Sequence, residues 1–284
     1  GDGDAALPAT PAARDPKGAM MPPQRLDPMR QGRLTAGASR RSLLRVLAAS
    51  PLALALVALH PEASSGRRRK RERCTVCAGA RCPFQSVQAA IDAAKPGAAI
   101  RLCAGAFNES ISIDKTLTLI GAGSGVDETT NTILDASGLN RRVVTINSGA
   151  GNVTLRGLRI TGGSVAGAGL YVNKGDHPVT LVACSVTGNV APNGGGIFND
   201  GGRIVLDGSA VAENEATNDG GGVVNLGTLT LKRGSSISSN TADGGAGSGG
   251  GVFNGGAVDA SGGTISGNAP DDCVNASGGS GCPV

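Results

Sequence analysis

Only one histidine in this 284-residue chain stands beside a carboxylate, so the search for acid–base chemistry begins there. Asp176 and His177 follow Lys174 on a predicted turn. General acid–base catalysis needs two ionisable groups that converge within a few ångströms. An isolated Asp–His pair on a turn is more often a solvated surface pair. The sequence therefore offers Asp176 and His177 as the only catalytic candidates and identifies no complete catalytic set.

Acidic residues in glycine-rich loops offer ligands for a metal ion. Asp243 opens the loop 243–251, which resembles calcium-binding nonapeptides without having their spacing. Asp219 and Asp200 occupy similar loop positions, but the three acids do not recur in one register. We expect no cofactor, and calcium at Asp219 and Asp243 is the alternative.

Seven cysteines form two clusters and one isolated position. A Cys-x-x-Cys pair can bind zinc or carry out thiol redox chemistry, whereas disulfides are favoured in an exported protein. We expect a disulfide between Cys273 and Cys282, and Cys184 is expected to be a buried free thiol. Two more disulfides are expected among four cysteines near the start of the predicted fold, Cys74, Cys77, Cys82 and Cys103.

The composition restricts the fold that could position these residues. The chain has 47 glycines, four phenylalanines, one tyrosine and no tryptophan. A globular domain of this length normally fills its core with aromatic side chains. The hydrophobic content of 39% argues against disorder throughout. A thin solenoid with a core of Val, Ile and Leu satisfies both observations.

Three series of short β-rich runs recur in phase, about every 26 residues. Turn residues separate the runs, which therefore predict strands, three in each coil. One coil cannot bury its own apolar side chains, but a stack of coils can. The fold class is therefore predicted to be all-β, a single-stranded right-handed parallel β-helix. One series ends in asparagines predicted to form a structural ladder, Asn147, Asn173, Asn199, Asn225 and Asn254.

Two segments are expected to close the ends of this solenoid. Val87, Ala90 and Ile91 lie on one face of a predicted helix with Ser86 as its N-cap, and Pro96-Gly97 ends it. The predicted boundaries are a capping helix within residues 83–99, a β-helix over 100–270 and a disulfide-closed tail over 271–284. A short helix at the end of the stack protects the edge strands from aggregation.

The first part of the chain is expected to direct export. Residues 39–65 combine Arg40-Arg41, an apolar stretch from Val46 to Leu59 and a following segment rich in small residues. This order resembles a twin-arginine signal peptide. A short membrane anchor is the alternative, although the apolar stretch is shorter than a bilayer span. Residues 1–38 are expected to be disordered or to precede the true start of the protein, and 66–82 to form a basic, cysteine-containing linker.

Several motifs resemble those of known β-helix families. Residues 84–135 resemble the opening of pectinesterase-like and pectate-lyase-like proteins, through Ser86-Val87-Gln88-Ala89-Ala90-Ile91 and Leu117-Thr118-Leu119-Ile120-Gly121. Ser239-Asn240-Thr241-Ala242 and Gly249-Gly250-Gly251-Val252-Phe253 are similar to repeats of polymorphic outer-membrane-type bacterial surface proteins. The resemblance implies a bacterial β-helix protein and says little of its activity, because one fold hosts many functions.

The sequence departs from the enzymes of these families. The Gln-Asp pair expected of pectinesterases is absent, and the one Asp-Asp pair, Asp271-Asp272, lacks the other polygalacturonase signatures. We therefore expect a secreted or cell-surface, non-catalytic protein that binds polysaccharide or mediates adhesion. A polysaccharide lyase, esterase or hydrolase is the first alternative, and a purely structural surface protein is the second.

Charge and composition limit the partners. Residues 1–73 hold 14 basic and 6 acidic residues, whereas the predicted folded part has a net charge of −4. This argues against nucleic acid as a partner. The mature chain is expected to be a monomer without a transmembrane span. The scarcity of aromatic residues weakens the case for sugar binding, since sugars commonly stack on aromatic rings.

Overall fold

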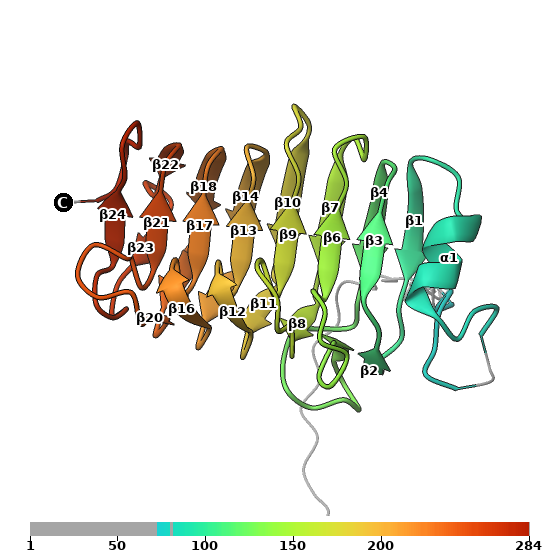
Figure 1. Ribbon diagram of the computed structural model, residues 1–284. Helices are drawn as coiled ribbons and strands as arrows, with labels where there is room; N and C mark the ends of the chain where they lie inside the picture. The colour runs from blue at the N-terminus through green and yellow to red at the C-terminus, as the bar shows by residue number, and fades with distance from the viewer. Residues whose placement is uncertain (1–72, 80–81, 284) are drawn as a thin grey trace, which may run out of the picture. The chain divides into compact units, whose positions relative to one another are not determined.

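The computed structural model describes residues 73–79 and 82–283, which form a parallel β-helix of about six turns (Figure 1). This confirms the predicted fold class and the coil length of about 26 residues. The predicted signal peptide at 39–65 and all but the last residue of the basic run 67–73 lie outside the described residues.

Three seven-stranded parallel sheets run along the stack. The first sheet contains, in stacking order, β1 (Ala98–Arg101), β4 (Leu117–Ile120), β7 (Val153–Arg156), β10 (Pro178–Val182), β14 (Arg203–Asp207), β18 (Thr228–Lys232) and β22 (Ala257–Asp259). The second contains β2 (Gly105–Asn108), β5 (Thr132–Asp135), β8 (Arg159–Thr161), β11 (Ser185–Thr187), β15 (Ala210–Ala212), β19 (Ser235–Ser238) and β23 (Gly263–Ile265). The third contains β3 (Ile111–Ile113), β6 (Val144–Ile146), β9 (Leu170–Val172), β13 (Ile197–Asn199), β17 (Val223–Asn225), β21 (Val252–Asn254) and β24 (Cys273–Asn275).

Some coils carry a fourth short strand that the sequence did not predict. These strands form a three-stranded parallel sheet between the second and third sheets, made of β12 (Val190–Asn193), β16 (Glu215–Asp219) and β20 (Thr241–Ala242). Each begins directly after an asparagine that ends the preceding corner, such as Asn189 before β12. The extra sheet gives these coils four sides.

The core is almost entirely aliphatic, as the composition predicts. In β7 the side chains of Val153 and Leu155 are fully buried, whereas Thr154 between them points outward. Full burial of one such aliphatic side chain stabilises the fold by about 1.5–3 kcal/mol. Because successive residues of a strand alternate between its two faces, every second position of each strand is left on the outer surface.

An asparagine ladder runs along the inner side of the third sheet over the last four coils. Asn199 donates from Nδ2 to Oδ1 of Asn225 at 2.7 Å, and Asn225 donates to Asn254 at 2.8 Å. Asn254 continues the ladder to Asn275 at 2.8 Å. The Asn199, Asn225 and Asn254 side chains are fully buried, so these bonds satisfy amides that water cannot reach.

The first two members of the predicted asparagine series do not join this row of asparagine side chains, but each still bonds to the preceding coil. Asn199 pairs in register with Val172, not Asn173, because the chain slips by one residue at this coil. A slip of one residue moves a side chain to the other face of the strand. Asn147 donates instead to Ser112 Oγ at 3.0 Å, and Asn173 donates to the carbonyl of Ile146 at 3.1 Å.

A second ladder, which the sequence reading missed, follows the corner after the second sheet. Asn189, Asn214 and Asn240 each donate from Nδ2 to the equivalent side chain one coil further on, at 2.9–3.0 Å. Asn268 continues the row and donates to Asp272 at 3.0 Å. The first three are fully buried, so these bonds satisfy amides that water cannot reach. Two polar ladders therefore bind the coils to one another inside an aliphatic core.

The N-terminal end of the stack is closed by α1 (Val87–Ala93), within the predicted range. Ser86 caps the helix by accepting from the amide of Ala89 at 3.2 Å. The carboxylate of Glu109 accepts from the amides of Val87 and Gln88 at 2.9 and 3.1 Å, which places an anion at the positive end of the helix. In residues 73–79 and 82–283, no helix is long and apolar enough to cross a membrane.

The C-terminal segment, which was predicted to be only a disulfide-closed tail, also contributes a strand to the β-helix. Its strand β24 adds a further member to the third sheet, in register with β21. The disulfide between Cys273 and Cys282 then closes the segment, as expected from the sequence.

Candidate functional site

The outer face of the third sheet carries the most distinctive side chains of the molecule. The strands of this sheet lie at the front in Figure 1. The middle residue of each strand points outward, and these residues pair in register along the stack: Ser112, Thr145, Tyr171, Phe198, Val224, Phe253 and Val274. Three of the five aromatic residues of the chain therefore lie in one row, which we call the outer row.

The two neighbouring rings in the outer row stack on each other. The centroids of Tyr171 and Phe198 are 5.5 Å apart with an interplanar angle of 20°. On Tyr171, the guanidinium carbon of Arg142 lies 3.7 Å from the ring centroid, in cation–π geometry. Arg142 and Phe198 thus both pack on Tyr171, and the tyrosine ring holds a positive charge in place.

Two further contacts fix this arrangement. The Tyr171 hydroxyl donates to Oδ2 of Asp200 at 2.9 Å, and Arg142 Nε donates to the carbonyl of Ala166 at 2.7 Å. Partial burial raises the pKa of Tyr171, and the hydrogen bond to the negatively charged Asp200 raises it further. The phenol stays protonated and keeps its donor role at any physiological pH.

Glycines keep the rings close to the backbone of the preceding corner. Gly167 has a φ of +70°, and a Cβ there would lie 2.8 Å from both Phe198 Cβ and Tyr171 Cδ2. Gly194, one coil further on, has a φ of +62° and would place a Cβ 3.0 Å from Phe198 Cβ. Both positions require glycine for conformation and for space.

A polar cavity of about 470 Å³ opens at the N-terminal end of the outer row. It is lined by Ser110, Leu139, Asn140, Arg141, Arg142, Thr145 and Val165, and we call it the arginine pocket. A second hollow of about 320 Å³ shares Ser110, Leu139 and Arg141 with it and reaches Glu109. The Glu109 carboxylate accepts hydrogen bonds from Ser86 and the first amides of α1. The two arginines of the pocket outnumber this one acid, so the combined hollow has a net positive charge.

The predicted catalytic candidates are not part of this site. Asp176 and His177 are exposed on the turn between β9 and β10, and no side chain of the described residues hydrogen-bonds to either of them. His177 borders a crevice of only about 10 Å³. The geometry therefore gives this pair no partner for acid–base chemistry.

The two calcium candidates lie on neighbouring coils, where β16 pairs with β20, and neither belongs to a group of three ligating side chains in the described residues. Asp219 ends β16, where its amide donates to Oδ1 of Asn193 at 3.3 Å, and Asp243 is exposed in the loop after β20. In the described part of the chain, one group of three metal-ligating residues converges, and it consists of Cys77, Cys82 and Cys103.

The structure has the three predicted disulfides, two among the first four cysteines and one at the C-terminal end. Disulfides join Cys74 to Cys103 and Cys77 to Cys82, beside the terminal Cys273–Cys282 bond. Cys184 is a buried free thiol, and its burial raises the pKa to about 11. The sequence left the connectivity of the first four cysteines open.

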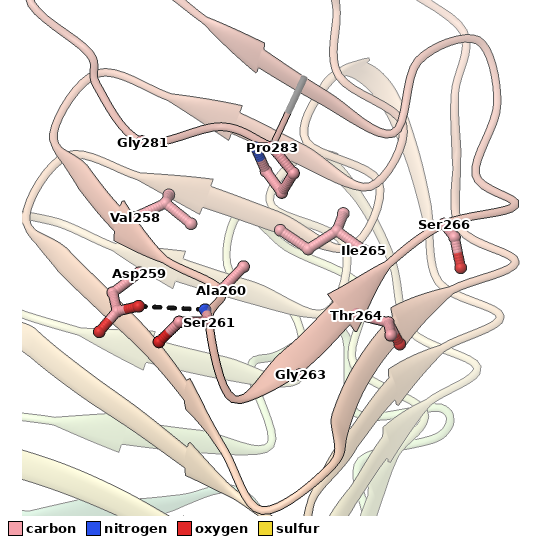
Figure 2. A pocket seen from close by; sticks show the side chains of 10 residues that line it. All are labelled: Val258, Asp259, Ala260, Ser261, Gly263, Thr264, Ile265, Ser266, Gly281 and Pro283. Atoms are coloured by element: carbon pink, nitrogen blue, oxygen red, sulfur yellow. Dashed lines mark hydrogen bonds between the residues drawn. The ribbon is translucent and has the colours of Figure 1, made fainter.

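The C-terminal end of the stack has an apolar cavity of about 740 Å³ (Figure 2). Val258 of β22 and Ile265 of β23 lie across it from each other, below Pro283. One of its polar side chains is engaged locally, because Asp259 accepts from the amide of Ser261 at 3.0 Å. This cavity marks the end of the core and offers few groups that could recognise a ligand.

The sequence alone does not predict the arginine pocket or the outer row. Aligning the middle residues of the Asn-ending strands would have shown Tyr171, Phe198 and Phe253 at equivalent outward positions. The loops that bring Arg141 and Arg142 beside them vary in length, so the positions of these two arginines could not be predicted from the repeat.

The chain matches no known family model, no curated protein and no solved structure closely enough to show a relationship.

Proposed function

We propose that this chain is a non-catalytic binding protein of the cell surface or the external medium, whose ligand is an acidic polysaccharide. The observation that carries the proposal is the pre-positioned Arg142, which borders the arginine pocket at one end of the outer row. Export itself rests on the predicted signal peptide.

Arg142 is suited to recognise a carboxylate or sulfate group. A guanidinium presents five N–H donors in a plane, and two of them can bind one anion in parallel. In Arg142 the Nε–H is taken by Ala166, and the Tyr171 ring restrains the plane. The terminal N–H groups remain to bind a ligand, and little conformational entropy is lost when they do so.

The surroundings of Arg142 supply further polar contacts. Arg141 adds a second cation, and Ser110, Asn140 and Thr145 add hydroxyl and amide groups. Such a mixture matches a sugar bearing an acid group and several hydroxyls. The rings of Tyr171 and Phe198 pack against each other, so they support the pocket more than they offer free faces for stacking sugars.

The solenoid favours an extended ligand. Equivalent positions repeat along the axis about every 4.8 Å. This spacing is similar to the length of one sugar residue in a linear chain. A polysaccharide anchored at the arginine pocket can therefore run along the outer row over several coils.

A binding assay on the full chain tests the proposal. We would measure the affinity for polygalacturonate and alginate, with dextran as the neutral polymer, with and without calcium. Replacing Arg142 by Ala should weaken binding to the acidic polymers by about tenfold or more, the value of one charge-assisted hydrogen bond. The matched control is Arg203→Ala, which removes an exposed arginine from β14 in the first sheet.

Two outcomes would overturn the proposal. The first is that the chain binds neither polygalacturonate nor alginate, which would favour a purely structural protein. The other is release of unsaturated sugars or methanol during the assay, which would show an enzyme. Equal losses in Arg142→Ala and Arg203→Ala would show charge attraction without a defined site, provided that thermal melting shows both variants to be folded.

A further inference from the structure

Four cysteines converge at the N-terminal end of the β-helix. The Cys74–Cys103 and Cys77–Cys82 disulfides lie side by side, and the Sγ atoms of Cys77 and Cys103 are 3.3 Å apart although they belong to different bonds. The sulfurs of Cys77, Cys82 and Cys103 all lie within 4.8 Å of one another. Cys74 is bonded to Cys103 and so adjoins these three residues, and the four cysteines together are here called the cysteine cluster.

We propose that the cysteine cluster, when reduced, is a binding site for Zn²⁺ with four thiolate ligands. In a tetrahedral site with Zn–S bonds of about 2.3 Å, neighbouring sulfurs are about 3.8 Å apart. Among Cys77, Cys82 and Cys103, the distances between unbonded sulfurs, from 3.3 Å to at most 4.8 Å, bracket this value. Small side-chain rotations therefore suffice for these three ligands, and Cys74 would supply the fourth by turning toward the ion once its bond to Cys103 is reduced.

The chemistry of the cluster selects zinc among the common cations. No carboxylate or imidazole of the described residues belongs to the group. Thiolates are soft ligands that favour zinc over calcium and magnesium, which take oxygen ligands. Cys74 and Cys77 also have the two-residue spacing that is common among structural zinc ligands. All four cysteines are half-buried, which shields the site without closing it to the ion.

The cluster holds a segment that covers the first strand. The amides of Thr75 and Val76 donate to the carbonyl of Arg101 at 2.7 and 3.0 Å, and Cys103 donates back to Val76 at 2.9 Å. Val76 is fully buried and bridges Leu102 and Phe84. Either two disulfides or one zinc ion would tie this segment to β1. The metal thus gives a reduced chain the same protected edge that the disulfides give an oxidised one.

The two states interconvert by balanced chemistry. Each disulfide takes two electrons from a dithiol reductant, which becomes a disulfide itself, and yields two thiols. The four thiols then release four protons as they bind one Zn²⁺. In the reverse direction a disulfide oxidant removes the electrons again, and zinc is released. A protein made in a reducing compartment and then exported to an oxidising one would pass through both states.

Cobalt binding to the full chain tests this proposal, which does not depend on the polysaccharide proposal. The chain is reduced with a phosphine, freed of reductant without air, and titrated with Co²⁺ and then Zn²⁺. We expect one Co²⁺ per chain, with the visible bands and sulfur charge-transfer absorption of a tetrahedral four-thiolate site, displaced by an equal amount of Zn²⁺. The oxidised chain should bind neither ion, and zinc should raise the melting temperature of the reduced chain alone.

Variants identify the ligands. Cys77→Ser and Cys82→Ser should each abolish the four-thiolate spectrum, whereas Cys184→Ser and the double variant Cys273→Ser/Cys282→Ser should retain it. The proposal is overturned if the reduced wild-type chain shows no tetrahedral thiolate spectrum. It is equally overturned if the spectrum survives in both Cys77→Ser and Cys82→Ser. Should these variants fail to fold, the comparison of reduced and oxidised wild-type chains decides the question, because the disulfide form contains no free thiolate in the cluster.

Discussion

Arg142 lies over the ring of Tyr171, with its guanidinium carbon 3.7 Å from the ring centroid, although the two residues belong to successive coils. The contact joins the variable loop before β6 to the regular row of side chains on the third sheet. Asp200, one coil further on, accepts a hydrogen bond from the same tyrosine. Three coils therefore cooperate to hold one arginine at the edge of the arginine pocket.

Loss of the Tyr171 ring should weaken binding to acidic polysaccharide without removing the charge. An exposed cation–π contact is worth about 0.5–1 kcal/mol, so Tyr171→Leu should lower the affinity about two- to fivefold. Tyr171→Phe keeps the ring and loses only the bond to Asp200, so its affinity should stay near wild type. Isothermal titration with polygalacturonate measures both. Unchanged affinity in Tyr171→Leu would show that Arg142 needs no support from the ring.

The asparagine ladder should contribute to stability and not to binding. Asn225 is fully buried and connects Asn199 to Asn254, so Asn225→Ala leaves buried polar groups without partners. We expect a loss of about 2–3 kcal/mol in the free energy of unfolding, measured by urea denaturation. Asn152→Ala, at an exposed position, is the control and should be neutral. A loss of polysaccharide binding in Asn225→Ala at unchanged stability would contradict the structural role.

The sequence predicted the repeating architecture better than the details of register. Hydrophobic runs in three phases required stacked strands, because no single coil can bury Val153 or Leu155 alone. The ladder was only partly predictable, since equal spacing of 26 residues between Asn173 and Asn199 hides a one-residue slip that only the pairing with Val172 shows. The site was not predictable, because Arg142 reaches Tyr171 through a loop whose path does not follow the repeat.

Acid should weaken the contact between the first-sheet strand β14 and the corner after β18. Arg233 hydrogen-bonds to Asp207 through Nε and a terminal nitrogen, and this contact lowers the pKa of Asp207. A carboxylate with a depressed pKa in the folded state stabilises the fold above its unfolded pKa of about 3.9, and the contribution is lost as the pH falls through the folded value. Urea midpoints between pH 7 and pH 2 should therefore fall more steeply for wild type than for Asp207→Asn. Asp176→Asn, which removes an exposed acid without hydrogen bonds, should follow the wild-type curve.

Cys184 should be inert to thiol reagents in the folded protein. Its Sγ donates to the carbonyl of Leu155 at 3.3 Å, and its pKa of about 11 leaves roughly one thiol in a thousand ionised at pH 8. An aromatic disulfide reagent should label no thiol of the oxidised native chain and one thiol after unfolding in urea. Rapid labelling of the native protein would show that the coil around β11 opens.

Close packing of coils at the glycine corners should make Gly221 intolerant of any side chain. A Cβ on Gly221 would lie 2.1 Å from the carbonyl oxygen of Thr241 in the next coil, a contact that only backbone movement can relieve. We expect Gly221→Ala to lose about 3 kcal/mol or more in unfolding free energy, at the upper end of single substitutions. Gly149→Ala is the matched control, because nothing lies within 4 Å of its Cβ and its φ is not positive. Equal stability of the two variants, measured by urea denaturation, would mean that the coils can separate at this corner without loss.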